Sequence, residues 1–316
     1  MRRVIIDCDP GIDDTLALML ALASPELEVV AVTTVAGNVP AKMGAQNARK
    51  VLHMMDRMNI PVYIGEETPL KIPYQDAMDT HGMDGMGEIN LPNVPGDFPK
   101  QGAVSYLEEA LERETLSVIA LGPLTNLARV FEKKPYLAQK IEEMVCMGGT
   151  FKSHGNCSPV AEYNFWCDPH GAALCFETFE KVGKQIHMIG LDVTRKIVLS
   201  LDLTELMCRI NPQVGGFIRD MTRFYVDFHW EQEGIIGCVI NDPLAVAYAI
   251  DRSLCDGFDS YTQVATDRIC RGQSVVDAEH FYRKPANSHI LTTTDPKKFW
   301  LFFMERVLLK TDANEK

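Results

Sequence analysis

The sequence lacks the features that mark several large classes of protein. It has no Lys/Arg run longer than two residues, and its 43 acidic residues outnumber its 31 basic ones. Nucleic-acid-binding proteins usually carry a basic face, so nucleic acid is not expected as a partner. The longest apolar run, residues 16–23, is far shorter than the ~20 residues that span a bilayer, so no membrane association is expected. The N-terminus passes from Met-Arg-Arg straight into an acidic motif, which does not fit a signal peptide and indicates a cytoplasmic location.

Cysteine pairs with metal-binding or redox spacing are also missing. None of the nine cysteines forms a Cys-x-x-Cys pair, so neither a zinc ribbon nor a thioredoxin-like site is indicated. An odd number of cysteines in a long chain is typical of reduced thiols. The chain has 316 residues, of which 46% are hydrophobic and 23% charged. That is the composition of a soluble globular protein, long enough to fold around a large core without disulfides or a structural metal.

Short β-rich segments alternate with helical patterns along most of the chain. Strands are expected at 2–7, 27–37, 60–65, 116–122, 142–149 and 184–192, and helices at 13–24, 41–55, 103–113, 124–134 and 168–179. The segment 202–252 looks mostly helical, and strands at 260–266 and 288–294 precede a closing helix at 297–309. This alternation predicts an α/β fold with a mostly parallel, doubly wound sheet and helices on both faces.

The organisation of the chain suggests one domain. No internal repeat, low-complexity tract or linker divides it, so a single domain over residues 1–316 is expected. The irregular stretch 66–101 is long for a connection, and such loops are often functional. In a sheet of this kind, ligands bind at the carboxyl ends of the strands.

The motif "DCDPGIDD", residues 7–14, places four carboxylates in eight positions. Asp7 ends the first expected strand, and Asp13 and Asp14 begin the helix that follows. One Asp at a helix start is a common cap, but clustered like charges raise one another's pKa unless they are neutralised. Ligation by carboxylate oxygens suits Ca²⁺ or Mg²⁺ better than Zn²⁺. The motif therefore predicts a divalent cation at the carboxyl edge of the sheet.

Two enzyme classes fit this motif. The opening "VIIDCD" resembles that of haloacid-dehalogenase-type phosphatases, which would make Asp7 a nucleophile and Mg²⁺ the cofactor. That interpretation also needs a downstream Lys and an acidic pair, and "KQIHMIGLDVTRK" fits neither well.

The second class is favoured by more of the chain. "DCDPGIDD" followed by "AVTTVAGNV" resembles the nucleoside hydrolases of the inosine-uridine preferring type, which cleave the N-glycosidic bond of ribonucleosides. Further motifs agree in order and spacing: "THGMDGMG" at 80–87, "ALGPLTNLA" at 120–128, "VCMGG" at 145–149, "GNCSPVAEYNFWCDP" at 155–169 and "GCVINDPLAVAYAID" at 237–251. The resemblance covers residues 3–310 and is specific because all the motifs occur together.

The resemblance implies a Ca²⁺ site and a catalytic base. Its ligands are matched by Asp9, Asp14, the backbone carbonyl of Leu121 and Asp242. The ion would take the ribose 2′- and 3′-hydroxyls and a nucleophilic water, and Asp9 is matched as the general base for that water. The transition state is expected to resemble an oxocarbenium ion, whose positive charge anionic oxygens stabilise. Asp242 can also cap the helix expected at 243–250.

The resemblance further implies a set of residues that bind the substrate. The ribose contacts are matched by Asp13, Asn38, Met147, Asn156, Glu162 and Asn164, and His81 is matched near the nucleobase. Glu162 and Asn164 lie two residues apart, and on an extended segment both side chains would point the same way. Recognition through hydroxyl groups predicts strong rejection of deoxyribose.

One position departs from the family pattern. Many members carry His before the Asp matched by Asp242, and this His is proposed to protonate the leaving base, but here the residue is Asn241. An amide does not titrate near neutral pH, so Asn241 occupies the leaving-group position without being able to act as an acid. Other candidates are His81 and residues of 223–234, in which Tyr225, His229 and Gln232 fall on one helical face and Trp230 and Glu233 on another. The preference for purine or pyrimidine stays open.

Because of Asn241, a non-enzymatic alternative also stays open, namely a nucleoside-binding or sensor protein without turnover. The expected partner in either case is a small-molecule nucleoside. Members of the resembled family are commonly dimers or tetramers, so a homodimer or homotetramer is expected.

Overall fold

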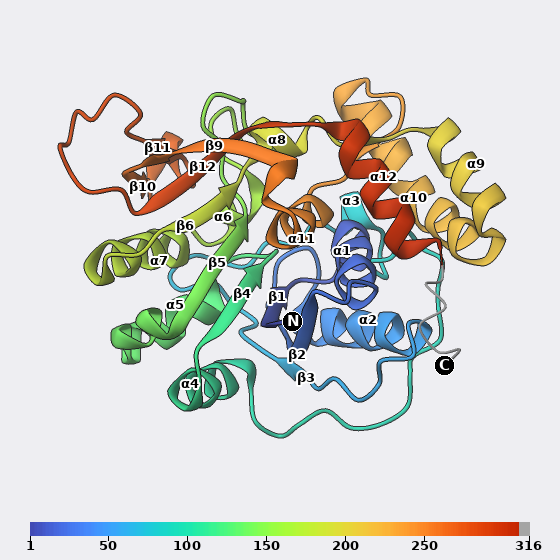
Figure 1. The fold of residues 1–316 in the computed structure, drawn as a ribbon, viewed down its shortest axis with the longest axis horizontal. Helices are drawn as coiled ribbons and strands as arrows, with labels where there is room; N and C mark the ends of the chain where they lie inside the picture. Colours follow the sequence, from blue (N-terminus) through green and yellow to red (C-terminus); the bar gives the residue numbers. More distant parts are fainter. Residues whose placement is uncertain (310–316) are drawn as a thin grey trace.

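An eight-stranded sheet runs through the computed structural model, which describes residues 1–309 (Figure 1). The strand order is β3-β2-β1-β4-β5-β6-β12-β9, and every neighbouring pair is parallel except β12 with β9. The bounds are β1 Arg2–Cys8, β2 Leu27–Thr34, β3 Val62–Ile64, β4 Leu116–Ala120, β5 Ile141–Met147, β6 Ile186–Ile189, β9 Cys255–Ser260 and β12 Ser288–Thr294. Two small antiparallel pairs join β7 (Val198–Leu199) to β8 (Cys238–Val239) and β10 (Thr262–Val264) to β11 (Ser274–Val276).

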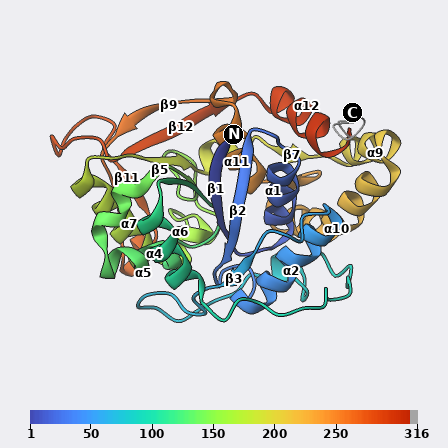
Figure 2. The ribbon, with the colours of Figure 1, turned by 60° about the horizontal axis from the view of Figure 1, so that its bottom comes forward.

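Helices cover both faces of the large sheet. Their bounds are α1 Ile12–Leu22, α2 Ala41–Met54, α3 Met78–His81, α4 Ala103–Arg113, α5 Thr125–Lys133, α6 Tyr163–Cys167, α7 Pro169–Val182, α8 Leu191–Thr194, α9 Leu201–Ile210, α10 Pro212–Glu233, α11 Asp242–Ile250 and α12 Pro296–Val307. Figure 2 shows α4, α5 and α7 on one side of strands β1 and β2, and α1 and α2 on the other. The expected mostly parallel sheet with helices on both faces is confirmed.

The central strand β1 shows why the sheet is buried on both sides. Successive side chains of a strand point to opposite faces. Val4, Ile6 and Cys8 belong to the core beneath α1 and α11, whereas Ile5 belongs to the core beneath α4, α5 and α7. All four side chains are fully buried, which explains why the segment reads as a continuous apolar run rather than an alternating one.

Near the C-terminus one expected strand was misplaced. The predicted strand 260–266 is divided between two sheets, because Ser260 ends β9 and Thr262 begins β10. The strand β9 lies at the edge of the large sheet, and its middle residues are exposed or half-buried. Its sequence, "CDGFDS", therefore carries almost no hydrophobic signal.

No helix within residues 1–309 is long and apolar enough to cross a membrane.

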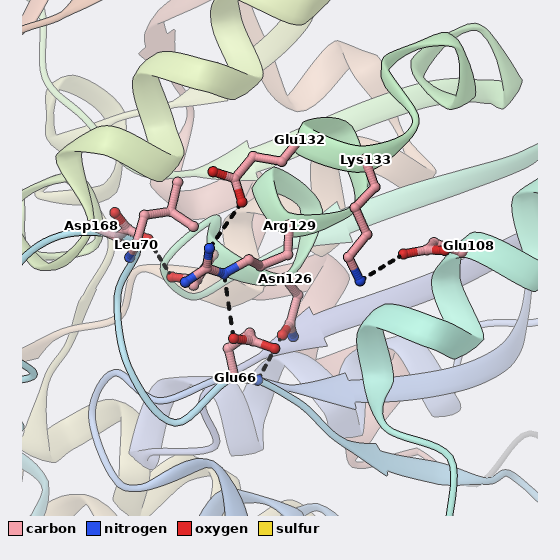
Figure 3. Close-up of polar contacts among 9 residues, drawn as sticks. Glu66, Leu70, Glu108, Asn126, Arg129, Glu132, Lys133 and Asp168 are labelled. Atoms are coloured by element: carbon pink, nitrogen blue, oxygen red, sulfur yellow. Dashed lines mark hydrogen bonds and ion pairs between the residues drawn. The ribbon is translucent and has the colours of Figure 1, made fainter.

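The start of the long irregular stretch is fastened to the sheet by buried side chains near α5 (Figure 3). Asn126 accepts a hydrogen bond from the Glu66 amide at 2.9 Å, and its Nδ2 donates to Asp7 at 2.8 Å and to the Thr34 carbonyl at 3.0 Å. Asp168 accepts from the Leu70 amide at 3.0 Å. These bonds fix the path of the chain where it leaves the carboxyl edge of the sheet.

We expect Asn126→Ala to lower the free energy of unfolding by about 2–3 kcal/mol, because the Glu66 amide, the Asp7 carboxylate and the Thr34 carbonyl each lose a hydrogen bond. Urea denaturation measures this loss. Lys133→Ala is the matched control on the same helix, since it removes only an exposed ion pair with Glu108 and should cost less than about 0.5 kcal/mol. Equal midpoints for the two variants would show that the Asn126 contacts do not stabilise the fold.

Candidate active site

Three carboxylates from two distant parts of the chain meet at the carboxyl edge of the sheet. Asp13 and Asp14 lie in the first turn of α1, and Asp242 is the first residue of α11. One oxygen from each lies within 4.8 Å of the others. Asp9 lies beside them, because its amide donates to Asp14 at 3.1 Å. The short turn between β1 and α1 and the packing of α1 against α11 therefore create one acidic cluster. The sequence motif predicted the convergence of Asp9, Asp13 and Asp14, whereas Asp242 was expected only from the family resemblance.

The cluster is electrostatically unfavourable as it stands. Burial, together with the charge of Asp13, raises the pKa of Asp14 to about 6. Burial and the neighbouring carboxylates also raise the pKa values of Asp9 and Asp242 well above their ordinary range. Backbone and amide donors offset part of this cost at Asp14, which accepts from the Gly11 amide and from Asn38 Nδ2, each at 3.0 Å. A bound cation would remove the remaining repulsion.

The Asp9 carboxylate is held in a cradle that only glycine permits. Its Oδ2 accepts from the Asn38 amide at 2.6 Å. A Cβ atom at Gly37 would lie 2.0 Å from this oxygen, and one at Gly122 would lie 2.4 Å from Oδ1, so any side chain at either position would displace the carboxylate. Within residues 1–309 the buried Oδ1 atoms of Asp9 and Asp13 have no hydrogen-bond partner. Buried anionic oxygens without partners are costly, and this all-oxygen donor set fits a hard cation such as Ca²⁺ or Mg²⁺.

Asp7, two residues earlier, plays a different part. It is fully buried, and its Oδ1 accepts from the Thr33 hydroxyl at 2.5 Å and from Asn126 at 2.8 Å. Burial raises the pKa of Asp7 to about 6. A carboxylate enclosed in this way cannot reach a substrate phosphate, so the phosphatase interpretation, which requires Asp7 as nucleophile, is not supported.

A cleft of about 890 Å³ opens above the acidic cluster. Asp9 and Asp14 lie fully buried beneath it. The remaining predicted site residues all line it: Asp13, Asn38, His81, Leu121, Met147, Asn156, Glu162, Asn164, Asn241 and Asp242. Residues more than 200 positions apart in the chain thus share one cavity.

Glu162 and Asn164 do not share one extended segment, because α6 begins at Tyr163, so that part of the sequence prediction was wrong. It occupies the N-cap position of the short helix α6, and its carboxylate accepts from the amides of Asn164 at 2.8 Å and Phe165 at 3.2 Å. It also accepts from the Gly149 amide at 2.9 Å. Burial nevertheless raises the pKa of Glu162 to about 7. These hydrogen bonds hold the Glu162 carboxylate at the wall of the cleft. The sequence prediction also placed Glu162 in the site, but on the assumption of an extended segment.

Asn164 links two strand ends. Its Nδ2 donates to the Leu121 carbonyl at 2.7 Å and to the Met147 carbonyl at 3.1 Å. These two residues follow or end the neighbouring strands β4 and β5. The side chain therefore fixes the backbone oxygen that the sequence had assigned to a metal.

Aromatic and imidazole groups form the wall contributed by α3 and α10. His81 Nδ1 accepts from the Ile12 amide at 3.1 Å, which leaves its proton on Nε2, and burial lowers the pKa of His81. Its ring lies 5.2 Å from that of Tyr225, between ring centroids. The predicted helical face is confirmed, since Tyr225, His229 and Gln232 line the cleft. Of the two residues expected on the other face, Trp230 is 60% exposed and does not line the cleft, whereas Glu233 does.

Asn241 precedes α11 and is oriented by Asp13. Its Nδ2 donates to Asp13 Oδ2 at 3.1 Å. The helix begins at Asp242, so the cap position expected for Asp242 belongs to Asn241. The side-chain amide therefore stands directly beside the acidic cluster.

Sequence reasoning missed Arg195, which also lines the cleft. One guanidinium nitrogen lies 3.1 Å from Glu233 at the end of α10, and another donates to the Gly155 carbonyl at 3.1 Å. Arg195 thus ties the segment that carries Asn156 to the helix that carries Tyr225. The local sequence "VTRKIV" contains no signal for this, because the partners lie about 40 residues away in either direction.

Comparison with known proteins gives a consistent result. The family model described as inosine-uridine preferring nucleoside hydrolase matches residues 4–301. The pyrimidine-specific ribonucleoside hydrolase RihA of Shewanella sp. (strain ANA-3) is 34% identical over 304 residues, covering 94% of this chain and 93% of the relative. The plant nucleoside hydrolase PpNRh1 superposes with a TM-score of 0.91 at 30% identity, covering 97% of this chain and 99% of that one. The purine-preferring ribonucleoside hydrolase from Gardnerella vaginalis gives a TM-score of 0.90 at 30% identity, covering 97% and 98%.

Proposed function

Because the chain belongs to the inosine-uridine preferring nucleoside hydrolases, a family of metal-dependent ribonucleoside N-glycosidases, we propose that it hydrolyses ribonucleosides to ribose and free base with Ca²⁺ as its cofactor. The observation that carries this proposal is the acidic cluster beneath the cleft. Buried carboxylates converge there, and oxygens of Asp9 and Asp13 lack partners in the described part of the chain. A metal-free protein gains nothing from that arrangement.

The proposed ligands are Asp9, Asp14, the Leu121 carbonyl and Asp242. Asp14 and Asp242 are already close together, and Asn164 positions the Leu121 carbonyl. A Ca²⁺ ion held there would neutralise the carboxylates, bind the ribose diol and lower the pKa of a water molecule. The site is built from oxygens alone, which suits Ca²⁺.

Asp9 is the proposed general base. Its Oδ2 is occupied by the Asn38 amide, whereas Oδ1 is free of partners among residues 1–309 and can accept a proton from water. The glycines at 37 and 122 leave room for the carboxylate in this position. As the C1′–N bond breaks, positive charge develops on the ribose, and the surrounding carboxylates stabilise it.

The other residues are proposed to hold the sugar and the base. Asp13, Asn38, Met147, Asn156, Glu162 and Asn164 contact the ribose, and His81 lies near the base. The side chains of Glu162 and Asn164 are fixed by backbone partners, so these two residues would bind hydroxyl groups without rearranging. Residues as far apart in the chain as Asp13 and Asp242 line the same cleft, and we propose that residues 1–316 act as one domain. A homodimer or homotetramer remains our expectation for the assembly.

The metal requirement is directly testable. We expect ribose release from inosine and uridine to fall at least ~100-fold after treatment with a chelator, because the carboxylates then repel one another and the water is no longer activated. Adding Ca²⁺ should restore the activity. A reducing-sugar assay measures it, and restoration by Mg²⁺ instead would reassign the ion.

Two outcomes of that assay would contradict the proposal. Full turnover in excess chelator would exclude the metal-dependent reaction. Tight, calcium-dependent nucleoside binding without any sugar release would favour a nucleoside-binding sensor protein. This is the second candidate function, because Asn241 cannot act as an acid.

A further inference from the structure

The segment between β5 and α6 reaches the cleft without secondary structure of its own. Residues 148–162, all of which the structure describes, form neither helix nor strand, although Asn156 among them lines the cleft. The path of such a segment depends on the groups that bind its backbone amides and carbonyls. After the turn, the Asn156 amide donates to the Ala161 carbonyl at 3.1 Å. Before it, the partners come from another element, the four-residue helix α8 and the residue that ends it.

Asp192, in α8, holds the first part of this segment. Its carboxylate accepts from the amides of Phe151 at 2.6 Å, Lys152 at 2.7 Å and Ser153 at 3.0 Å. Three consecutive amides bound by one carboxylate fix the direction of the backbone. Arg195 follows one helical turn later and binds the next two residues, so this short element holds the segment as far as residue 155.

The Arg195 guanidinium joins the segment to the end of α10. Its Nη2 donates to the Gly155 carbonyl, directly before Asn156, at 3.1 Å. Its Nη1 donates to His154 Nε2 and to the Glu233 carboxylate, each at 3.1 Å. An arginine only donates, so His154 Nε2 is the acceptor, and the proton on Nδ1 goes to the Gly155 carbonyl at 2.8 Å. One planar group therefore holds three partners at once, which a lysine ammonium does less rigidly.

Stability alone does not explain this arrangement. The buried Nε of Arg195 has no hydrogen-bond partner within residues 1–309, and a buried donor without a partner costs free energy. The side chain also lines the cleft, and 20% of its surface is exposed there. A charged group that is kept at the cleft with one donor unused requires a further reason.

We propose that Arg195 is a positioning residue for the reaction and acts through Asn156. The inference rests on the proposed function, in which Asn156 binds the ribose. The guanidinium holds the peptide directly before Asn156 against Glu233, the last residue of α10, and so fixes where the Asn156 amide meets the sugar. Without it, the irregular segment would relax and hold the sugar less accurately above the carboxylates. Displacements of about 1 Å in such positioning groups can cost about 10²-fold in rate.

A double-mutant cycle on Arg195 and Asn156 tests the proposal with the calcium-loaded enzyme. We expect Arg195→Gln to lower kcat/KM for inosine and uridine at least about 30-fold in the wild-type background. In the Asn156→Ala background the same change should cost no more than about threefold, because Arg195 then has nothing left to position. Lys196→Gln is the matched control. It removes an exposed cation from the next position and should change kcat/KM by less than about twofold.

A purely structural role predicts a different result. The loss of activity would then follow the thermal midpoint and would be the same with and without Asn156. Arg195→Lys is the second variant, because it keeps a charge opposite Glu233 but cannot hold all three partners. It replaces Arg195→Gln in the cycle if that protein fails to fold. Loss of the fold in both variants would make Arg195 a structural residue and overturn the inference.

The outcomes separate this inference from the proposed function. If the wild type releases no ribose from inosine or uridine, the proposed function fails, and the inference fails with it. If the wild type cleaves these nucleosides but the effects of the two substitutions simply multiply, the enzyme is a nucleoside hydrolase in which Arg195 does not act through Asn156.

Discussion

Replacing Asp9 by Asn is expected to lower kcat on inosine and uridine by about 10³-fold or more, because the variant loses a general base and a metal ligand together. The fold should persist. An Asn at this position can still accept the Asn38 amide hydrogen bond through its side-chain oxygen, and it fits the same space between Gly37 and Gly122. Removing one charge from the acidic cluster should also raise the thermal midpoint of the metal-free protein. Steady-state kinetics and calorimetry measure the two effects.

Asp7→Asn is the control for this experiment. It makes the same change two residues away, in a carboxylate that faces Thr33 and Asn126 rather than the cleft. It should affect stability more than turnover. Normal activity in Asp9→Asn, or an equal loss of activity in both variants, would remove Asp9 from the proposed role.

The second large effect is expected on the substrate side. We expect kcat/KM for thymidine to be about 10³-fold lower than for 5-methyluridine, which differs only by its 2′-hydroxyl, because buried polar groups built to bind that hydroxyl would be left without a partner. Asp13 and Asn164 are held at the wall of the cleft by other contacts and cannot turn to find new partners. The same reducing-sugar assay compares the two substrates.

Asp13→Ala tests which residue causes this discrimination. If Asp13 binds a ribose hydroxyl, the variant should lose far more activity on 5-methyluridine than on thymidine, so the two substrates become more alike. An unchanged ratio would mean that Asp13 acts on both substrates equally, for example by orienting Asn241 or the metal.

The parts of the site that could be predicted from the residues alone are those that lie close together in the chain. Asp9, Asp13 and Asp14 are joined by one sharp turn, so their convergence follows from the strand and helix that flank it. Asp242 lies more than 200 residues away and could be placed only through the family resemblance. The sheet was predictable because buried parallel strands such as β1 are continuous apolar runs.

What could not be predicted depends on tertiary contacts. Glu162 forms a helix cap because Gly149 and Phe165 present their amides to it, and the local sequence does not show this. The edge strand β9 is defined by its pairing with β12, since its own sequence shows no continuous apolar run. Arg195 gains its role from partners on two other segments.

The meeting of α1 with α11 also bears on how the protein is made. Asp14 is synthesised early, whereas Asp242 leaves the ribosome only after three quarters of the chain. A nascent chain therefore carries three crowded carboxylates without the fourth until late in translation. Since binding energy for an ion is gained only when its ligands are brought together, the proposed Ca²⁺ ion should stabilise a fold that contains Asp242 far more than a fragment that ends before it.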